Sequence, residues 1–374
     1  MQATLNGVVR GAAPPVAEKR TSTRRLVKGN EAIALGAVAG GLDCFFGYPI
    51  TPQNEIPEIL SDVLPRLGRV FLQAESEVAS INMVYGAAAA GHRAMTTSSG
   101  PGISLMMEGL SYIAGARLPC LIVNIMRGGP GLGNIAPSQG DYFQACKGGG
   151  HGDYHNIVLA PWNVQEMFDF PSLAFDLSER YRVPGFILAD AVLGAMLEPA
   201  VVPSEFPPVP RAERPWATTG RGTRDHKNVV NSLWLDPNEL CAHCEELQAA
   251  YLEARREVRF DARQVDDAEI VVIAYGISAR LAYSAVRVLR QRGKRVGLLR
   301  PITLYPFPTE AIAELATRVK SLLVVELSSG QMLEDVRLAV EGRCPVHFFG
   351  RMGGVLPSPE ELEDVLQGYL QGGR

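Results

Sequence analysis

Short apolar segments that alternate with helical segments limit the folds open to this chain more than any other feature. Residues 44–48, 70–73, 94–97 and 120–125 predict strands, and the segments between them have the apolar spacing of helices. The last of these strands is almost entirely apolar, which is typical of a parallel strand covered on both faces. The alternation therefore predicts an α/β fold built on an open parallel sheet.

Four loops directly follow predicted strands. In an open parallel sheet, ligands bind beyond the carboxyl ends of the strands. We therefore expect the four loops to cluster at one edge of the sheet. They comprise residues 48–52, 73–77, 98–102 and 126–139.

A second α/β unit follows the first. Residues 269–349 predict four strands with helices between them. A proline-rich stretch, residues 199–215, predicts a surface linker before this unit, and residues 237–258 predict a charged, solvent-facing helix. The expected organisation is an N-terminal arm (1–27), a first domain (28–198), a linker with the charged helix (199–266) and a C-terminal domain (267–374).

Length limits the number of domains, while charge and hydrophobicity argue against nucleic acid and membranes as partners. A chain of 374 residues suggests two or three domains, at roughly 100–200 residues per domain. A formal net charge of −4 gives no basic surplus for nucleic acid or for an anionic membrane surface. The sequence has no stretch of about 18 apolar residues that would predict a membrane span. We therefore expect neither nucleic acid nor a membrane as a partner.

The cysteines and the N-terminus give indications of the cellular compartment of the protein. The six cysteines are dispersed, which favours a reducing, cytoplasmic compartment. Cys241 and Cys244 flank a histidine like half of a metal site, but no second cysteine pair completes a tetrahedral set. Residues 1–25 are basic, which leaves two interpretations open: an arm that binds a partner, or a transit peptide.

The first loop places a threonine between two prolines. Thr51 follows Pro49 and Ile50 and precedes Pro52. Because proline fixes the backbone, the hydroxyl group of Thr51 is held rigidly and suits a small polar ligand. An ordinary turn in which Thr51 caps the next helix explains the pattern equally well.

The second loop carries two carboxylates, Glu75 and Glu77, just before a buried apolar helix. Acidic residues in the first turn of a helix stabilise it, and this explanation suits Glu75. Glu77 lies deeper among apolar residues, where a carboxylate is costly unless a partner meets it. Glu77 is therefore a candidate functional group.

The fourth loop begins with Arg127, which is followed by glycines at 128, 129, 131 and 133. Arginine at a strand end can bind a carboxylate through two hydrogen bonds, and glycine allows close approach of the backbone. A surface ion pair is the alternative. The segment 131–136 also matches G-x-G-x-x-A, but Pro137 follows where a dinucleotide-binding fold needs a helix.

Taken in order, these motifs resemble those of the alpha subunit of 2-oxoacid:ferredoxin oxidoreductases, which are thiamine diphosphate enzymes. The motifs of the first domain are residues 48–52, 75–77, 97–102 and 127–130. Residues 300–308 and 330–332 resemble the family's C-terminal domain. The resemblance implies a pyrimidine-type thiamine-diphosphate-binding domain with an open parallel sheet, and a C-terminal transketolase-like α/β domain.

The resemblance implies CoA-dependent oxidative decarboxylation of a 2-oxoacid to acyl-CoA and CO2, with reduction of ferredoxin. The 2-oxoacid is 2-oxoisovalerate or 2-oxoglutarate, and residues 128–154 look most like the branched-chain members. An aromatic 2-oxoacid, a non-oxidative thiamine diphosphate decarboxylase subunit and a non-catalytic scaffold remain alternatives.

The resemblance also assigns roles to residues. Glu77 corresponds to the glutamate that hydrogen-bonds N1′ of the cofactor's aminopyrimidine ring, and Thr51 and Arg127 to the residues that hold the 2-oxoacid. These three are the expected catalytic residues. The expected cofactor contacts lie in the same loops and are Pro49, Ile50, Thr51, Glu77, Ser99 and Gly100.

The chain lacks the Gly-Asp-Gly motif that usually binds the diphosphate through magnesium, and it lacks clustered cysteines. The resemblance therefore implies a beta subunit that carries Mg2+, the diphosphate site and a 4Fe-4S cluster, so that thiamine diphosphate is shared between subunits. Gamma and ferredoxin-like delta subunits, CoA, and ferredoxin or another electron acceptor are the further expected partners. No metal site is expected on this chain.

Overall fold

A seven-stranded sheet forms the first half of the computed structural model, which describes residues 22–206, 209 and 213–371. The strand order is β12-β6-β7-β5-β4-β2-β3, and all neighbours are parallel except β12 and β6. The strands are β2 (Cys44–Gly47), β3 (Val70–Gln73), β4 (Ala94–Ser98), β5 (Leu121–Met126), β6 (Ile157–Leu159), β7 (Gly185–Asp190) and β12 (Thr303–Tyr305). The predicted α/β fold with an open, mostly parallel sheet is confirmed.

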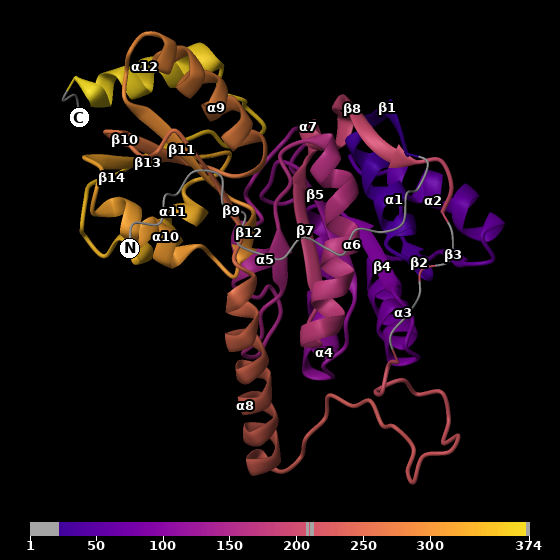
Figure 1. The fold of residues 1–374 in the computed structure, drawn as a ribbon. Coiled ribbons are helices and arrows are strands. Elements are labelled where there is room, and N and C mark those ends of the chain that lie inside the picture. The colour runs from indigo at the N-terminus through magenta and orange to yellow at the C-terminus, as the bar shows by residue number, and fades with distance from the viewer. Residues whose placement is uncertain (1–21, 207–208, 210–212, 372–374) are drawn as a thin grey trace.

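Helices cover both faces of this sheet (Figure 1). One face packs against α1 (Gly29–Ala39), α2 (Glu55–Arg66), α6 (Val164–Tyr181) and α7 (Ala191–Ala195). The other face packs against α3 (Glu77–Ala89), α4 (Pro101–Gly115) and α5 (Tyr142–Cys146). Alternate residues of each strand point to opposite faces, so Val123 and Ile125 enter the first core and Ile122 and Met126 the second.

A five-stranded sheet, ordered β14-β13-β10-β11-β9, forms the C-terminal domain. Its strands are β9 (Phe260–Arg263), β10 (Ile270–Ile273), β11 (Val296–Pro301), β13 (Ser321–Glu326) and β14 (Val346–Gly350). Its helices are α9 (Gly276–Gln291), α10 (Thr309–Ala316), α11 (Gln331–Val340) and α12 (Pro359–Leu370). Residues of α10 and α11 join the same apolar core as α3 and α4, so the two halves share buried surface.

Helix α8 (Pro237–Ala254) runs beside the first domain toward the C-terminal domain (Figure 1), and the short helix η1 (Arg255–Glu257) follows it. The sequence predicted a solvent-facing helix, and most of its side chains are exposed. Leu247 and Tyr251 are nevertheless buried in the shared core, because one side of α8 packs on the first domain. Within the described residues, no helix is long and apolar enough to cross a membrane.

Two predictions about connecting segments need correction. Residues 22–27 were predicted as part of an arm and residues 199–203 as part of a linker, yet β1 (Ser22–Lys28) pairs antiparallel with β8 (Leu197–Pro203). Prolines are tolerated in β8 because it has one partner only, so a missing N–H group can face away from the pair. Residues 1–21 lie outside the described part of the chain. The proposed division into domains stays a prediction.

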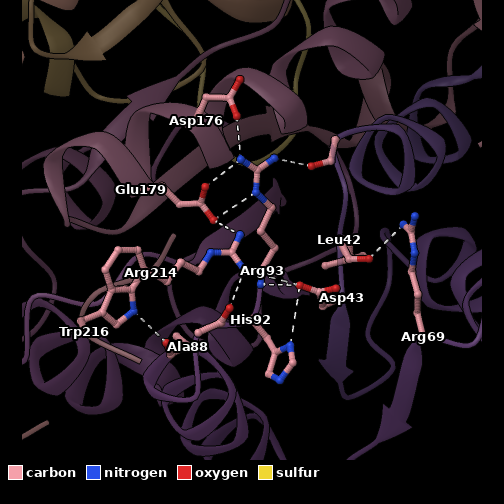
Figure 2. A network of polar contacts seen from close by, with 12 residues as sticks. Leu42, Asp43, Arg69, Ala88, His92, Arg93, Asp176, Glu179, Arg214 and Trp216 are labelled. Atoms are coloured by element: carbon pink, nitrogen blue, oxygen red, sulfur yellow. Dashed lines mark hydrogen bonds and ion pairs between the residues drawn. The ribbon is translucent and has the colours of Figure 1, made fainter. Parts of the chain in front are cut away.

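A network of ion pairs lies at the amino end of the seven-stranded sheet (Figure 2). Arg93 lies just before β4, and its Nη2 donates to Asp176 at 2.7 Å and to Glu179 at 2.8 Å. Its Nε donates to Glu179 at 3.1 Å, and its Nη1 donates to the carbonyl of Gly40. Arg214, from the segment after β8, also pairs with Glu179. The network thus fastens this segment to the first domain.

Candidate active site

The four predicted loops meet at the carboxyl edge of the first sheet. Nη1 of Arg127, after β5, donates to the carbonyl of Thr51, after β2, at 2.9 Å. A Cβ atom built on Gly100, after β4, would lie 3.3 Å from Nε of Arg127. A Cβ atom built on Gly102 would lie 2.5 Å from Oε1 of Glu77, which begins the helix after β3. This edge is the candidate active site.

Arg127 is only 8% exposed, and among the described residues its side chain donates hydrogen bonds to carbonyl groups alone. Besides Thr51, its Nη2 donates to the carbonyl of Leu132 at 3.3 Å. Among the described residues, Nε has no hydrogen-bond partner and no carboxylate forms an ion pair with the guanidinium. A buried guanidinium has donors and a positive charge left for an anionic ligand.

Glu77 is the first residue of α3 and is 6% exposed. Ser76 caps the helix by accepting a hydrogen bond from the N–H of Ala79 at 3.1 Å, which places Glu77 in the first turn. No described residue donates a hydrogen bond to the Glu77 carboxylate. The other acidic residue of this loop, Glu75, is exposed. The structure therefore distinguishes the two glutamates as their sequence positions predicted.

Two buried serine hydroxyls end β4 beside Glu77. Oγ of Ser98 would lie 2.1 Å from a Cβ atom on Gly102, so both oxygens, Ser98 Oγ and Glu77 Oε1, face the bare backbone of this glycine. The hydroxyls of Ser98 and Ser99 have no hydrogen-bond partner among the described residues. Buried polar atoms are rarely left unpaired, so an ordered ligand or water is expected at such a cluster.

The loop 48–52 meets Arg127 through the backbone of Thr51. Thr51 is exposed, and its hydroxyl accepts a hydrogen bond from Asn54 at 3.3 Å, while its carbonyl meets Arg127. Pro49 is exposed and Ile50 is half-buried. The loop is anchored by Gln53, which is fully buried and accepts a hydrogen bond from Thr97 at 2.5 Å.

Two further polar residues of this edge, Asn124 and Asp141, were not predicted from the sequence. Asn124 lies beside Ser98 on the neighbouring strand and donates to Oδ2 of Asp141 at 2.9 Å. Burial raises the pKa of Asp141, while the hydrogen bond from Asn124 and the charge of Arg127 oppose this shift. An asparagine within an otherwise apolar strand was the signal that could have identified this pair.

Metal ligands are not gathered at this edge. The parts of the chain that the structure describes contain no group of three or more histidine, cysteine, aspartate or glutamate residues that could hold a metal ion. Cys241 and Cys244 are free thiols on α8, and His243 between them contacts the carbonyl of Gly115 at 2.6 Å.

Comparison with known families covers most of the chain. Residues 35–264 match the family described as pyruvate flavodoxin/ferredoxin oxidoreductase, thiamine diphosphate-binding. Residues 268–362 match the family described as pyruvate:ferredoxin oxidoreductase core domain II.

Several relatives share nearly the full length of the chain. The ketoisovalerate oxidoreductase subunit VorB of Methanothermobacter thermautotrophicus is 55% identical over 92% of this chain and 96% of its own length. The 2-oxoglutarate synthase subunit KorA of Methanocaldococcus jannaschii is 36% identical over 91% of this chain and 99% of its own length.

Two solved structures are similar in fold. The 2-oxoglutarate:ferredoxin oxidoreductase from Magnetococcus marinus, with 2-oxoglutarate, coenzyme A and succinyl-CoA bound, has a TM-score of 0.82 and 27% identity. This match covers 93% of the present chain but 65% of the other, so the present chain is shorter. A split-gene transketolase has a TM-score of 0.54 at 12% identity, a likeness in fold alone.

Proposed function

Because the chain belongs to the pyruvate flavodoxin/ferredoxin oxidoreductase family, we propose that it is the alpha-type subunit of an enzyme that oxidatively decarboxylates a 2-oxoacid. The enzyme transfers the acyl group to coenzyme A and passes the electrons to ferredoxin. The observation that carries this proposal is the carboxyl edge, where a buried glutamate and a buried arginine without a carboxylate partner lie in adjoining loops.

The fit to thiamine diphosphate rests on Glu77 and its surroundings. The buried carboxyl group of Glu77 lies against the bare backbone of Gly102, and the hydroxyls of Ser98 and Ser99, which have no partner among the described residues, offer further hydrogen bonds to a polar ring. The described residues therefore fit the aminopyrimidine half of the cofactor. When bound, thiamine diphosphate supplies the carbanion chemistry of decarboxylation.

The chain's own groups bind, orient and exchange a proton. Glu77 holds a proton at the ring nitrogen N1′. Because Glu77 is buried, little water competes for this hydrogen bond. Arg127 binds the carboxylate of the 2-oxoacid with the donors that its carbonyl partners leave free. Thr51 is exposed at this edge, and in our proposal its hydroxyl binds the substrate. The further proposed contacts of the cofactor are Pro49, Ile50, Ser99 and Gly100.

We favour 2-oxoisovalerate as the substrate. The higher identity to a ketoisovalerate oxidoreductase subunit, 55% against 36% for a 2-oxoglutarate synthase subunit, supports a branched-chain acid. The site gives a physical reason as well, because the charge of Arg127 acts on Asp141, and a second substrate carboxylate beside this aspartate would need a further cation. 2-Oxoglutarate and aromatic 2-oxoacids are the competing substrates.

The partners follow from what the sequence lacks. Without a Gly-Asp-Gly motif or clustered cysteines, the chain needs a beta subunit that supplies Mg2+, the diphosphate site and a 4Fe-4S cluster. Gamma and ferredoxin-like delta subunits complete the proposed complex in the cytoplasm. The names of the relatives, which are subunits themselves, support an assembly of several chains.

The test is to purify the complex without oxygen through a tag on this chain and to measure CoA-dependent reduction of a viologen dye. We expect 2-oxoisovalerate to give the highest kcat/KM in a panel with 2-oxoglutarate, pyruvate and phenylpyruvate. Preference for another 2-oxoacid would overturn the substrate and keep the enzyme class. A complex with no turnover on any acid would overturn the function, and turnover without any electron acceptor would identify a non-oxidative decarboxylase.

A further inference from the structure

The loop that begins at Arg127 folds back onto it. The N–H of Gly128 donates to the carbonyl of Ala136 at 2.9 Å, and Pro137 pairs with Arg127 in a backbone bridge. The loop also provides the Leu132 carbonyl that accepts the Nη2 hydrogen bond of Arg127. The orientation of the guanidinium therefore depends on the conformation of residues 128–137.

Close backbone contacts define this conformation. A Cβ atom at Gly133 would lie 1.7 Å from the carbonyl oxygen of Gly128, and the φ angle of Gly133 is +57°. Only glycine satisfies both conditions without displacing the backbone. The glycines that the sequence places after Arg127 thus allow the loop to close on itself.

The C-terminal domain holds the exposed part of the loop. Nδ2 of Asn134 donates to the carbonyl of Gly353 at 2.9 Å, while its Oδ1 accepts the N–H of Ala136 at 2.9 Å. A Cβ atom on Gly354 would lie 2.3 Å from Cβ of Ala136, so the backbone of Gly354 packs closely against the side chain of Ala136. One asparagine therefore links the loop both to itself and to the other domain.

The C-terminal domain also holds the base of the loop through Gln139, which is fully buried. Its Oε1 accepts hydrogen bonds from Ser278 at 2.7 Å and from the N–H of Leu327 at 2.9 Å. Its Nε2 donates to the carbonyl of Tyr275 at 2.9 Å. Both atoms of the amide are thus committed to the C-terminal domain.

A third set of contacts fixes the segment that follows. Nε2 of Gln331 donates to the carbonyl of Gly140 at 2.6 Å, and its Oε1 accepts the N–H of Phe143 at 2.8 Å. These two bonds flank Asp141, which reaches back to Asn124 beneath the site. The C-terminal domain thereby places Asp141 as well as the loop.

We propose that the C-terminal domain positions Arg127 for the carboxylate of the substrate, with Asn134, Gln139 and Gln331 as positioning residues. The inference rests on the proposed function, because it takes Arg127 as the group that binds this carboxylate. None of the three positioning side chains hydrogen-bonds to Arg127, and they act through the backbone of the loop. Their contribution therefore belongs to substrate binding rather than to the chemical step.

The first test substitutes the exposed Asn134 in the complete complex. Asn134→Ala removes both the hydrogen bond to Gly353 and the one from the N–H of Ala136, and we expect the KM for 2-oxoisovalerate to rise about tenfold while kcat stays within twofold. The matched control is Asn238→Ala, an exposed asparagine on α8, which is expected to leave both constants unchanged. An unchanged KM in Asn134→Ala, or a fall in kcat at constant KM, would overturn the proposal.

The second test uses Gln331→Met, which keeps the length of the side chain and removes both of its hydrogen bonds. We expect faster hydrogen–deuterium exchange of the backbone across residues 128–143 in the complex, and a KM increase in the same direction as for Asn134→Ala. Gln367→Met, a half-buried glutamine on α12, is the control. Unchanged exchange across residues 128–143 would overturn the proposal.

The exchange measurement also separates this inference from the proposed function. If the wild-type complex turned over no 2-oxoacid, the proposed function would fail, and exchange alone would decide the inference. Faster exchange in Gln331→Met and in Asn134→Ala would then still support the inference that contacts with the C-terminal domain restrain residues 128–143. Exchange equal to that of the wild type in both variants would refute it.

Discussion

Two arginines at opposite ends of the same sheet, Arg93 largely buried and Arg127 buried, show how differently one residue type is used. Arg93, at the amino end of β4, meets two carboxylates and a carbonyl, and each of its guanidinium nitrogens donates a hydrogen bond (Figure 2). Arg127, at the carboxyl end of β5, meets two carbonyls, and its Nε has no partner among the described residues. The charge of Arg93 is paired with carboxylates of the same chain, whereas the charge of Arg127 is available to bind an anionic ligand.

The same contrast extends to the neighbours of each arginine. Around Arg93, Asp43 accepts the Arg93 N–H at 2.9 Å and Trp216 donates to a carbonyl at 3.2 Å. Around Arg127, the hydroxyls of Ser98 and Ser99 have no hydrogen-bond partner among the described residues. Buried polar atoms are normally paired, so this cluster of unpaired atoms is the pattern expected of a functional site.

The largest effect is expected at the carboxyl end, for Glu77→Gln. Removal of the proton-holding carboxyl group is expected to lower the turnover of the complex by a factor of about 100 to 10,000. The folded state should persist, because no described residue depends on the carboxylate for a hydrogen bond. CoA-dependent viologen reduction measures the loss, with exposed Glu75→Gln as the control. Turnover within tenfold of the wild type would remove Glu77 from the proposed role.

A pair of matched substitutions tests the contrast directly. Arg93→Met removes the arginine partner of Asp176 and one of the two arginine partners of Glu179, and we expect the free energy of unfolding to fall by about 3 kcal/mol. Arg127→Met breaks no ion pair and is expected to change it by less than about 1 kcal/mol, while raising the KM for the 2-oxoacid. Urea denaturation of both variants provides the measurement. Equal destabilisation by the two substitutions would abolish the distinction.

Asp190, at the carboxyl end of β7, combines both situations. One of its carboxylate oxygens has hydrogen-bond partners, and the other has none among the described residues. Its Oδ1 caps α7 by accepting the N–H of Val192 at 2.9 Å, while its Oδ2 has no partner among the described residues. Burial raises the pKa of Asp190 to about 6, from an ordinary value of 3.8. Between these values the folded chain binds a proton that the unfolded chain has lost. The contribution of Asp190 to stability is therefore greatest below pH 4 and is lost as the pH rises through 6.

Asp190→Asn keeps the capping oxygen and removes the titration. We expect the free energy of unfolding of the variant, relative to the wild type, to increase by about 2 kcal/mol between pH 4 and pH 7. Urea denaturation of both proteins at several pH values measures this difference, and the other carboxyl groups cancel. A difference that does not change with pH would show that Asp190 titrates normally.

The smallest effect is expected for Thr51→Val. The hydroxyl of Thr51 is exposed and accepts one long hydrogen bond from Asn54, at 3.3 Å. Loss of one hydrogen bond of about 1 kcal/mol to the substrate predicts a KM increase of about fivefold. Steady-state kinetics with 2-oxoisovalerate measure it, with the exposed Thr223→Val as a control. If KM is unchanged, only the carbonyl of Thr51, through Arg127, contributes to the site.

The sequence predicted the parts of this contrast that depend on local pattern. Glu77 and Arg127 were identified because each follows a predicted strand, and carboxyl ends of parallel strands share one edge. Gln139 was not identified, because its partners Tyr275 and Leu327 are 136 and 188 residues away along the chain. The strand β8 was missed because its prolines suggest a linker, and only its pairing with β1 explains them.

The strand β12 has a consequence for the order in which the chain folds. It belongs to the C-terminal half of the sequence, yet it completes the first sheet by pairing with β6. During synthesis, β6 emerges from the ribosome 144 residues before β12, a delay of roughly 7 to 30 s at about 5–20 residues per second. For that interval β6 is the outermost strand on its side of the nascent sheet, a position that β12 takes in the finished sheet, and the edge of such a strand is a surface on which strands from other chains can add. We therefore expect translation speed and chaperone access over residues 160–305 to affect the yield of the protein.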